Sequence, residues 1–170
     1  MMRIGFLVLT LGLLTSTLGR AESSVNLKTF FEANKMKPRW GEKREIFGTE
    51  SKRTLVVGFA SWCGYCQAEM PEIVRLYSQY HGCGLDVVGL GVEKEAEATG
   101  KAVKEWGIPF PVIQDDQYAA KRFLGVKKIP ALYLTDSKGI EVSREEGATG
   151  AKKMYAHIKD AFKDSKCLKP

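Results

Sequence analysis

Two cysteines separated by two residues, Cys63 and Cys66, are the side chains of this chain whose spacing most directly predicts chemistry. They lie in "FASWCGYCQAEMPE", residues 59–72, which has an apolar lead-in and an acid two residues before a proline. Three interpretations compete for such a pair: a reversible disulfide, half of a metal site, or a structural bridge. The rest of the sequence has to distinguish between them.

A metal site is the weaker interpretation. Structural zinc needs four ligands at suitable spacing, and neither a second C-x-x-C nor an H-x-H occurs. The other candidate ligands are dispersed, namely His81, Cys83, His157 and Cys167. A purely structural staple would more often join elements far apart in sequence. We therefore predict a reversible disulfide and no metal.

The segments on either side of the pair predict how it is positioned. Residues 54–60, "TLVVGFA", form a continuous apolar run that is typical of a strand covered on both faces. From Cys66 onward, apolar residues recur at helical spacing, at Met70, Ile73, Val74 and Tyr77. Cys63 is thus expected at a helix N-terminus, where unpaired N–H groups and the helix dipole favour a thiolate. Cys66 is expected one turn further on, on the buried face.

Strands and helices alternate along the rest of the chain. We expect a strand at 85–92 and a helix at 95–107 that ends at Gly107. An extended piece follows at 108–116, and its acids can cap a helix at 117–125. A hairpin at 131–143 and a last helix from near Thr149 complete the order. A helical lead-in at 25–37 ends before Pro38, and residues 38–53 are expected to be mostly loop. This order predicts a parallel sheet to which the hairpin adds two antiparallel strands.

Composition and the N-terminus restrict the class of protein. The chain has 170 residues, 44% hydrophobic and 27% charged, as in an ordinary soluble domain. Residues 4–14 form an apolar run that follows one early charge and precedes small residues around Gly19 and Ala21, which predicts a signal peptide. An uncleaved anchor is the alternative. The net charge of +6 is scattered and has no aromatic interleaving, so we expect no nucleic-acid binding.

The chain resembles the thioredoxin superfamily and, within it, the exported TlpA/ResA-like thiol-disulfide oxidoreductases. The resemblance covers residues 53–163 and rests on "FASWCGYC", "CQAEMP", "WGIPFPVIQD" and "KKIPALYLTDSKG". It implies an α/β fold with a central mixed sheet, helices on both faces, and the branch's extra strand-helix insert. The expected organisation is a signal peptide at 1–21, a lead-in at 22–52, and the thioredoxin-like domain at 53–170.

The resemblance also implies roles for individual residues. Cys63 is the nucleophile, Cys66 resolves the mixed disulfide, and Glu69 transfers protons, because Val57 stands where thioredoxin has a buried aspartate. A solvated helix glutamate is the alternative reading of Glu69. Pro130 is implied to be a cis-proline that leaves the backbone of Ile129 free for an extended substrate. The other residues expected at the substrate are Trp62, Gly64 and Tyr65.

The expected function is reduction of disulfides in exported proteins, which by family analogy include apocytochrome c. A membrane thiol donor would recharge the pair, no cofactor is needed, and we expect a periplasmic monomer. A disulfide oxidant or isomerase is the alternative with the same chemistry, and a redox-inert binding module is the alternative from another class. We also expect Cys83 and Cys167 to form a structural disulfide at the pole opposite Cys63, with two free thiols or an intermolecular bridge as the alternative.

Overall fold

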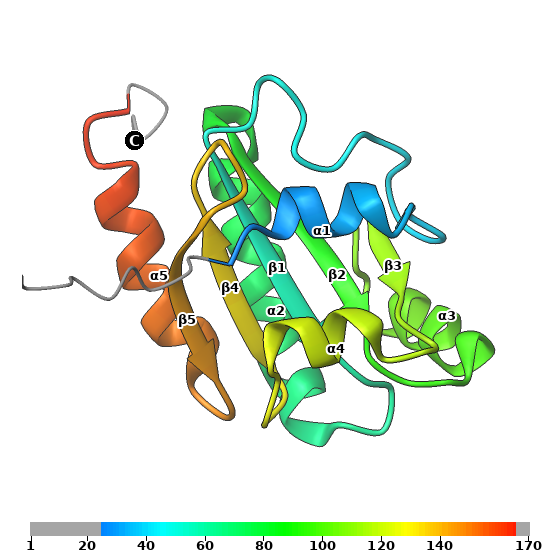
Figure 1. Cartoon of the computed structure of the whole chain (residues 1–170). Helices are drawn as coiled ribbons and strands as arrows, with labels where there is room; N and C mark the ends of the chain where they lie inside the picture. The colour runs from blue at the N-terminus through cyan, green and yellow to red at the C-terminus, as the bar shows by residue number, and fades with distance from the viewer. Residues whose placement is uncertain (1–24, 166–170) are drawn as a thin grey trace, which may run out of the picture.

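A five-stranded mixed sheet forms the centre of the protein (Figure 1). The computed structural model describes residues 25–165. The strand order is β3-β2-β1-β4-β5. The strands are β1 (Arg53–Phe59), β2 (Leu85–Gly91), β3 (Val112–Gln114), β4 (Ala131–Thr135) and β5 (Glu141–Glu146). The helices are α1 (Leu27–Ala33), α2 (Gly64–Tyr80), α3 (Ala96–Glu105), α4 (Ala119–Leu124) and α5 (Gly150–Ala161), with a short 3₁₀ turn at His81–Cys83.

The central strand β1 is buried on both faces, as its continuous apolar run predicted. Leu55, Val57 and Phe59 point to one face, where α2 and α5 pack, and Val56 points to the other, where α1 and α4 pack. Successive side chains of a strand alternate in direction, so an unbroken apolar run serves two cores at once. Figure 1 shows α1 and α4 in front of the sheet and α2 behind it.

The direction of the strands differs in one respect from the prediction. β1, β2 and β3 are parallel, and β4 is antiparallel to β1. β5 is antiparallel to β4 and therefore runs in the same direction as β1, so the expectation of two antiparallel strands was wrong for the second strand of the hairpin. A hairpin necessarily reverses direction, and only its first strand can oppose β1.

The lead-in region also differs from the prediction. The helix α1 ends at Ala33, before the predicted end at Lys37, because Asn34 caps it and Lys35 has a positive φ of 51°. Residues 38–52 contain no regular strand, although Trp40 forms an isolated bridge with Val112 beside β3. Within residues 25–165, none of the helices has the length and apolar content that crossing a bilayer requires.

Two features of this fold position the cysteine pair. Parallel strands β1 and β2 end at the same edge of the sheet, and α2 begins directly after β1 at that edge, the lower end in Figure 1. The chain returns to this edge at the start of β4, which pairs directly with β1. Residues before β4 are thus brought beside the start of α2.

Candidate active site

The cysteine pair lies at the junction of β1 and α2. Cys63 and Cys66 form a disulfide, with their Cα atoms 5.2 Å apart. Cys63 is the N-cap of the 17-residue helix α2, and its Sγ lies 3.1 Å from the backbone N of Cys66, which donates to it. An N–H donor and the positive end of a long helix both stabilise a sulfur that carries negative charge. The predicted position of Cys63 at a helix N-terminus is confirmed.

The two cysteine residues differ in exposure. Cys63 is 6% exposed and Cys66 is completely buried in the core between α2 and the sheet. An incoming thiol or a substrate disulfide therefore reaches Cys63 and does not reach Cys66. This asymmetry supports attack at Cys63 and resolution by Cys66.

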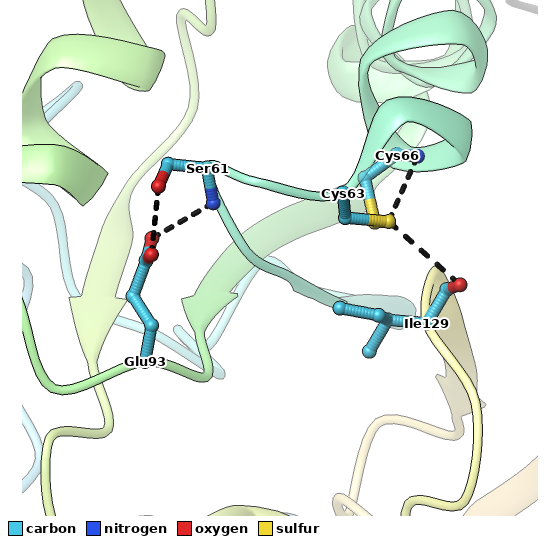
Figure 2. The surroundings of a disulfide bond; sticks show 5 residues. All are labelled: Ser61, Cys63, Cys66, Glu93 and Ile129. Carbon is cyan, nitrogen blue, oxygen red and sulfur yellow. Dashed lines mark hydrogen bonds between the residues drawn. A yellow bond between two sulfur atoms is a disulfide. The ribbon is translucent and has the colours of Figure 1, made fainter.

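The segment before β4 contributes the other side of the site. The Ile129–Pro130 peptide bond is cis, and the carbonyl oxygen of Ile129 lies 3.8 Å from the Sγ of Cys63 (Figure 2). Glu146 holds this segment by accepting the backbone N–H groups of Lys127 and Lys128, each at 3.2 Å. Among the backbone hydrogen bonds of residues 25–165, none uses the N–H of Ile129. An extended peptide can therefore pair with that N–H group.

The surroundings of Cys63 are aromatic and open. Trp62 is 72% exposed and Tyr65 is 67% exposed, so both rings face solvent beside the disulfide. Gly64 lies between them with no heavy atom within 4 Å of the position a Cβ would take. A flat, apolar and unobstructed rim of this kind suits a polypeptide better than a small polar ligand.

The carboxylate of Glu69 makes a contact that neither sequence interpretation included. One of its oxygens accepts the backbone N–H of Thr149, and the other accepts that of Ala151 at 2.9 Å. These residues begin α5, so Glu69 caps a helix that is distant in sequence. Thr149 has a positive φ of 72°, which is uncommon for a β-branched residue and which the contact with Glu69 helps to hold. The role of Glu69 in proton transfer stays a prediction.

A second carboxylate, Glu93, was not predicted. Its two oxygens face Ser61, two residues before Cys63 (Figure 2). The sequence contained a usable signal, because Glu93 follows directly after the apolar strand that ends beside the cysteine pair. A charged residue at the end of a parallel strand, at the same edge as a candidate site, is a candidate for that site.

The remaining expectations concern metal binding and the second cysteine pair. Residues 25–165 contain no cluster of three or more His, Cys, Asp or Glu side chains arranged to hold a metal ion. Cys83 is 7% exposed and lies directly after α2, at the end of the molecule opposite Cys63. The predicted pairing with Cys167 lies outside the described residues.

Comparisons with known proteins agree with this geometry. The Redoxin family matches residues 45–160. The thiol-disulfide oxidoreductase ResA of Bacillus thuringiensis (strain Al Hakam) is 26% identical over 119 residues, which are 70% of this chain and 69% of that protein. ResA of Oceanobacillus iheyensis is 24% identical over 116 residues, 68% of this chain and 60% of that protein.

Solved structures share the fold. StoA of Bacillus subtilis superposes with a TM-score of 0.61 at 21% identity, over 72% of this chain and 93% of that one. A candidate DsbE-type thiol:disulfide interchange protein of Chlorobium tepidum superposes with a TM-score of 0.62 at 24% identity, over 66% and 81% of the two chains. The fold and the cysteine pair define a thioredoxin-fold protein of the TlpA/ResA-like type. By its sequence, the chain belongs to the Redoxin family.

Proposed function

We propose that this protein is a thiol-disulfide oxidoreductase that acts outside the cytosol and reduces the disulfides of exported proteins. One observation carries the proposal: the accessible sulfur of Cys63 caps a helix beside the cis-peptide segment, while its partner Cys66 is buried. A bridge that only stabilised the fold would not need one reachable sulfur at an open, aromatic rim. The names of the relatives, thiol-disulfide oxidoreductase and thiol:disulfide interchange protein, describe the same class of chemistry.

The reaction proceeds by two exchanges at the cysteine pair. In the reduced protein, the thiolate of Cys63 attacks one sulfur of a substrate disulfide, and the other substrate sulfur leaves and takes up a proton. Cys66 then loses its proton and attacks the Sγ of Cys63, which releases the second substrate thiol and forms the Cys63–Cys66 disulfide. Two electrons and two protons have passed to the substrate. A dithiol donor at the membrane then reduces the Cys63–Cys66 disulfide by two exchanges of the same kind, is itself oxidised to a disulfide, and restores the dithiol.

The substrate is bound as an extended segment. Its backbone pairs with the free N–H of Ile129 next to cis-Pro130, in the manner of a strand added to an edge. The exposed rings of Trp62 and Tyr65 cover the residues on either side of the substrate cysteine, and the absence of a side chain at Gly64 lets the substrate backbone approach. Such contacts select an unfolded or flexible cysteine-containing polypeptide and carry little sequence specificity.

Localisation and partners form the finer part of the proposal. The apolar run at residues 4–14 supports export, with 1–21 as a signal peptide, 22–52 as a lead-in and 53–170 as the redox domain. Cysteine-containing exported proteins are the substrates, and by family analogy they include apocytochrome c. The protein acts as a monomer without a cofactor.

The test of this function is exchange with a model protein disulfide. The mature protein should accelerate the reduction of insulin by dithiothreitol, and Cys63→Ser should abolish the acceleration. Cys66→Ser should accumulate mixed disulfides through Cys63, because the resolving thiol is missing. A more reactive Cys66 than Cys63 would reverse the assigned roles, and no acceleration by the wild type would favour a redox-inert module.

The direction of electron flow needs a separate measurement. Equilibration of the Cys63–Cys66 couple with a thiol buffer gives its reduction potential. A value near about −270 mV supports a reductase, and a value near about −120 mV supports an oxidant. The Gly-Tyr pair between the cysteines also occurs in disulfide isomerases, so an intermediate potential would favour that second function.

A further inference from the structure

Glu93 is a buried carboxylate at the active-site end of the sheet that the exchange reaction itself does not use. It is 2% exposed and stands two residues after β2. Its side chain crosses to the loop between β1 and α2, which carries Cys63 (Figure 2). A buried carboxylate costs several kcal/mol unless it is well hydrogen-bonded, so its partners show what it is for.

Three donors converge on this carboxylate. Oε1 accepts the backbone N–H of Ser61 at 2.8 Å and the hydroxyl of Thr99 at 2.8 Å. Oε2 accepts the hydroxyl of Ser61 at 2.7 Å. Both oxygens act only as acceptors, which is the pattern of an ionised carboxylate, and hydrogen bonds to a charged acceptor are the stronger kind. Glu93 thus forms hydrogen bonds with both the backbone N–H and the side-chain hydroxyl of Ser61.

Ser61 is the residue through which Glu93 can act on the nucleophile. The backbone N–H of Cys63 donates to the carbonyl of Ala60 at 3.0 Å, so residues 60–63 form a closed turn with Ser61 inside it. Fixing Ser61 fixes the direction in which the chain enters α2. That direction sets whether the Sγ of Cys63 faces the N–H of Cys66 and the carbonyl of Ile129.

Thr99 anchors the same carboxylate from the other side. It is fully buried in the first turn of α3, and its hydroxyl donates to Glu93, while no hydrogen bond joins Thr99 to residues 60–63. Among the hydrogen bonds of the described residues, Thr99 is therefore linked to the turn before Cys63 through Glu93. This separation allows the action of Glu93 to be tested without altering the turn itself.

We propose that Glu93 is a positioning residue for the redox pair, which holds the turn at Ser61 so that Cys63 meets the N–H groups at the start of α2. The inference deepens the proposed function and rests on it for the role of Cys63 as nucleophile. Without the carboxylate, the N–H and hydroxyl of Ser61 lose their acceptor and the turn loosens. A reduced Cys63 then spends less time facing the donors that stabilise its thiolate.

The test measures the thiol of Cys63 directly. Reduced protein is alkylated with iodoacetamide across pH 5 to 9, and peptide mapping assigns the rate to Cys63. We expect Glu93→Ala to slow alkylation at pH 7 about tenfold and to move the pH midpoint upward. Glu93→Gln should be no more than about twofold slower than the wild type, because the amide oxygen can still accept the N–H of Ser61.

Asp115 offers a matched control at the same end of the sheet. It is also 2% exposed, and it accepts the backbone N–H groups of Ala120 and Lys121 at 3.1 and 2.8 Å, but it forms no hydrogen bond with residues 60–63. Asp115→Ala should lower the melting temperature and leave the alkylation of Cys63 unchanged. A folded Glu93→Ala with wild-type alkylation, an equal loss in Asp115→Ala, or a Glu93→Gln as slow as Glu93→Ala would each overturn the proposal.

Two milder variants keep the test decisive if Glu93→Ala does not fold. Thr99→Val and Ser61→Ala each remove one of the three hydrogen bonds, and each should slow alkylation a few-fold in the same direction. Unchanged rates in both variants would overturn the role of Glu93. Because alkylation reports the thiol alone, the result is readable even if the wild type fails to reduce insulin, an outcome that would refute only the proposed function.

Discussion

The two ends of the sheet hold their buried and half-buried carboxylates in different ways. At the active-site end, Glu69, Glu93 and Asp115 accept backbone N–H groups and hydroxyls, and none of them forms an ion pair within residues 25–165. At the opposite end, Asp86 meets the guanidinium of Arg44 at 2.7 Å. The same guanidinium contacts the ring of His81.

The difference shows what each end requires. Carboxylates that accept backbone N–H groups fix loops and helix starts without placing a cation beside the sulfur. The reactivity of the sulfur then depends on the helix terminus and on geometry. The opposite end holds a charged cluster in which burial raises the pKa of Asp86 although Arg44 opposes the shift. The charged side chains at that end contribute to stability and lie far from the cysteine pair. Changes at that end should therefore alter stability alone, and changes at the active-site end should alter exchange.

The largest effect is expected at the opposite end, from the cysteine pair that we propose there. The rings of Tyr80, in the last turn of α2, and Phe162, the C-cap of α5, lie 5.6 Å apart, so Cys83 and the chain after α5 start from neighbouring positions. A Cys83–Cys167 disulfide would close a long loop, worth roughly 4 kcal/mol on the chain-entropy model and often less. Replacing both cysteines by serine should lower the free energy of unfolding accordingly, measured in denaturant.

The activity of the same double variant tests whether a change at the opposite end alters stability alone. Insulin reduction per folded molecule should equal that of the wild type, because neither residue takes part in exchange. Non-reducing peptide mapping of the wild type should yield the Cys83–Cys167 peptide. Two free thiols, or a bridge between two chains, would contradict the pairing.

A smaller, pH-dependent effect is expected from Tyr77 at the same end. Burial, together with the hydrogen bond that its hydroxyl donates to Glu42 at 2.6 Å, raises the pKa of Tyr77 from 10.0 to about 12. Between these values the folded protein keeps a proton that the unfolded chain releases, so the stabilisation is complete below pH 10 and is lost as the pH rises through 12. We expect roughly 2 kcal/mol of stability to disappear across this interval.

Tyr77→Phe isolates that contribution. The difference in unfolding free energy between the wild type and Tyr77→Phe should fall with pH between 10 and 12 and stay constant below 10, as measured by urea denaturation at each pH. Glu42→Gln should reduce the slope, because the charge that opposes the tyrosinate is gone. A difference that does not vary with pH would show that Tyr77 titrates alike in the folded and unfolded states.

Much of the fold was predictable because local patterns and covalent order constrain it. The run "TLVVGFA" identified the central strand, the spacing from Cys66 to Tyr77 identified α2, and Asp115 caps α4 as the acids before that helix suggested. The end of α1 was missed because it depends on a positive φ at Lys35, which no composition rule indicates. The direction of β5 was predicted wrongly, because a hairpin reverses direction and its second strand must therefore run parallel to β1.

The parts of the site formed by residues close together in sequence were predictable. The contacts between residues far apart in sequence were not. Cys63 and Cys66 are three residues apart, and the apolar strand before them and the helical pattern after them placed both at one helix start. Glu69 and Glu93 act on partners 80 and 32 residues away, in α5 and in the loop before α2. Sequence spacing cannot show which distant N–H group a carboxylate will meet, because this depends on how the helices pack on the sheet.

The smallest effect on stability is expected from Glu69. This residue lies on α2, the helix that begins at the cysteine pair, and it also caps α5, so its substitution tests whether a carboxylate at the active-site end affects exchange as well as stability. Glu69→Ala removes the acceptor for the N–H groups of Thr149 and Ala151 and should cost about 1 kcal/mol of unfolding free energy, the usual value of a helix cap. Glu69→Gln keeps one amide oxygen as an acceptor and should cost less.

The activity of Glu69→Gln decides between anchoring and proton transfer. If Glu69 takes the proton of Cys66, the amide, which cannot accept it, should slow exchange and change the pH profile of the rate while the fold stays stable. If Glu69 only caps α5, Glu69→Gln should exchange at the wild-type rate at every pH from 5 to 9, and Glu69→Ala should differ from it in stability alone. Measuring both rates and both unfolding free energies separates these outcomes, because loss of a cap does not alter the pH at which the buried thiol loses its proton.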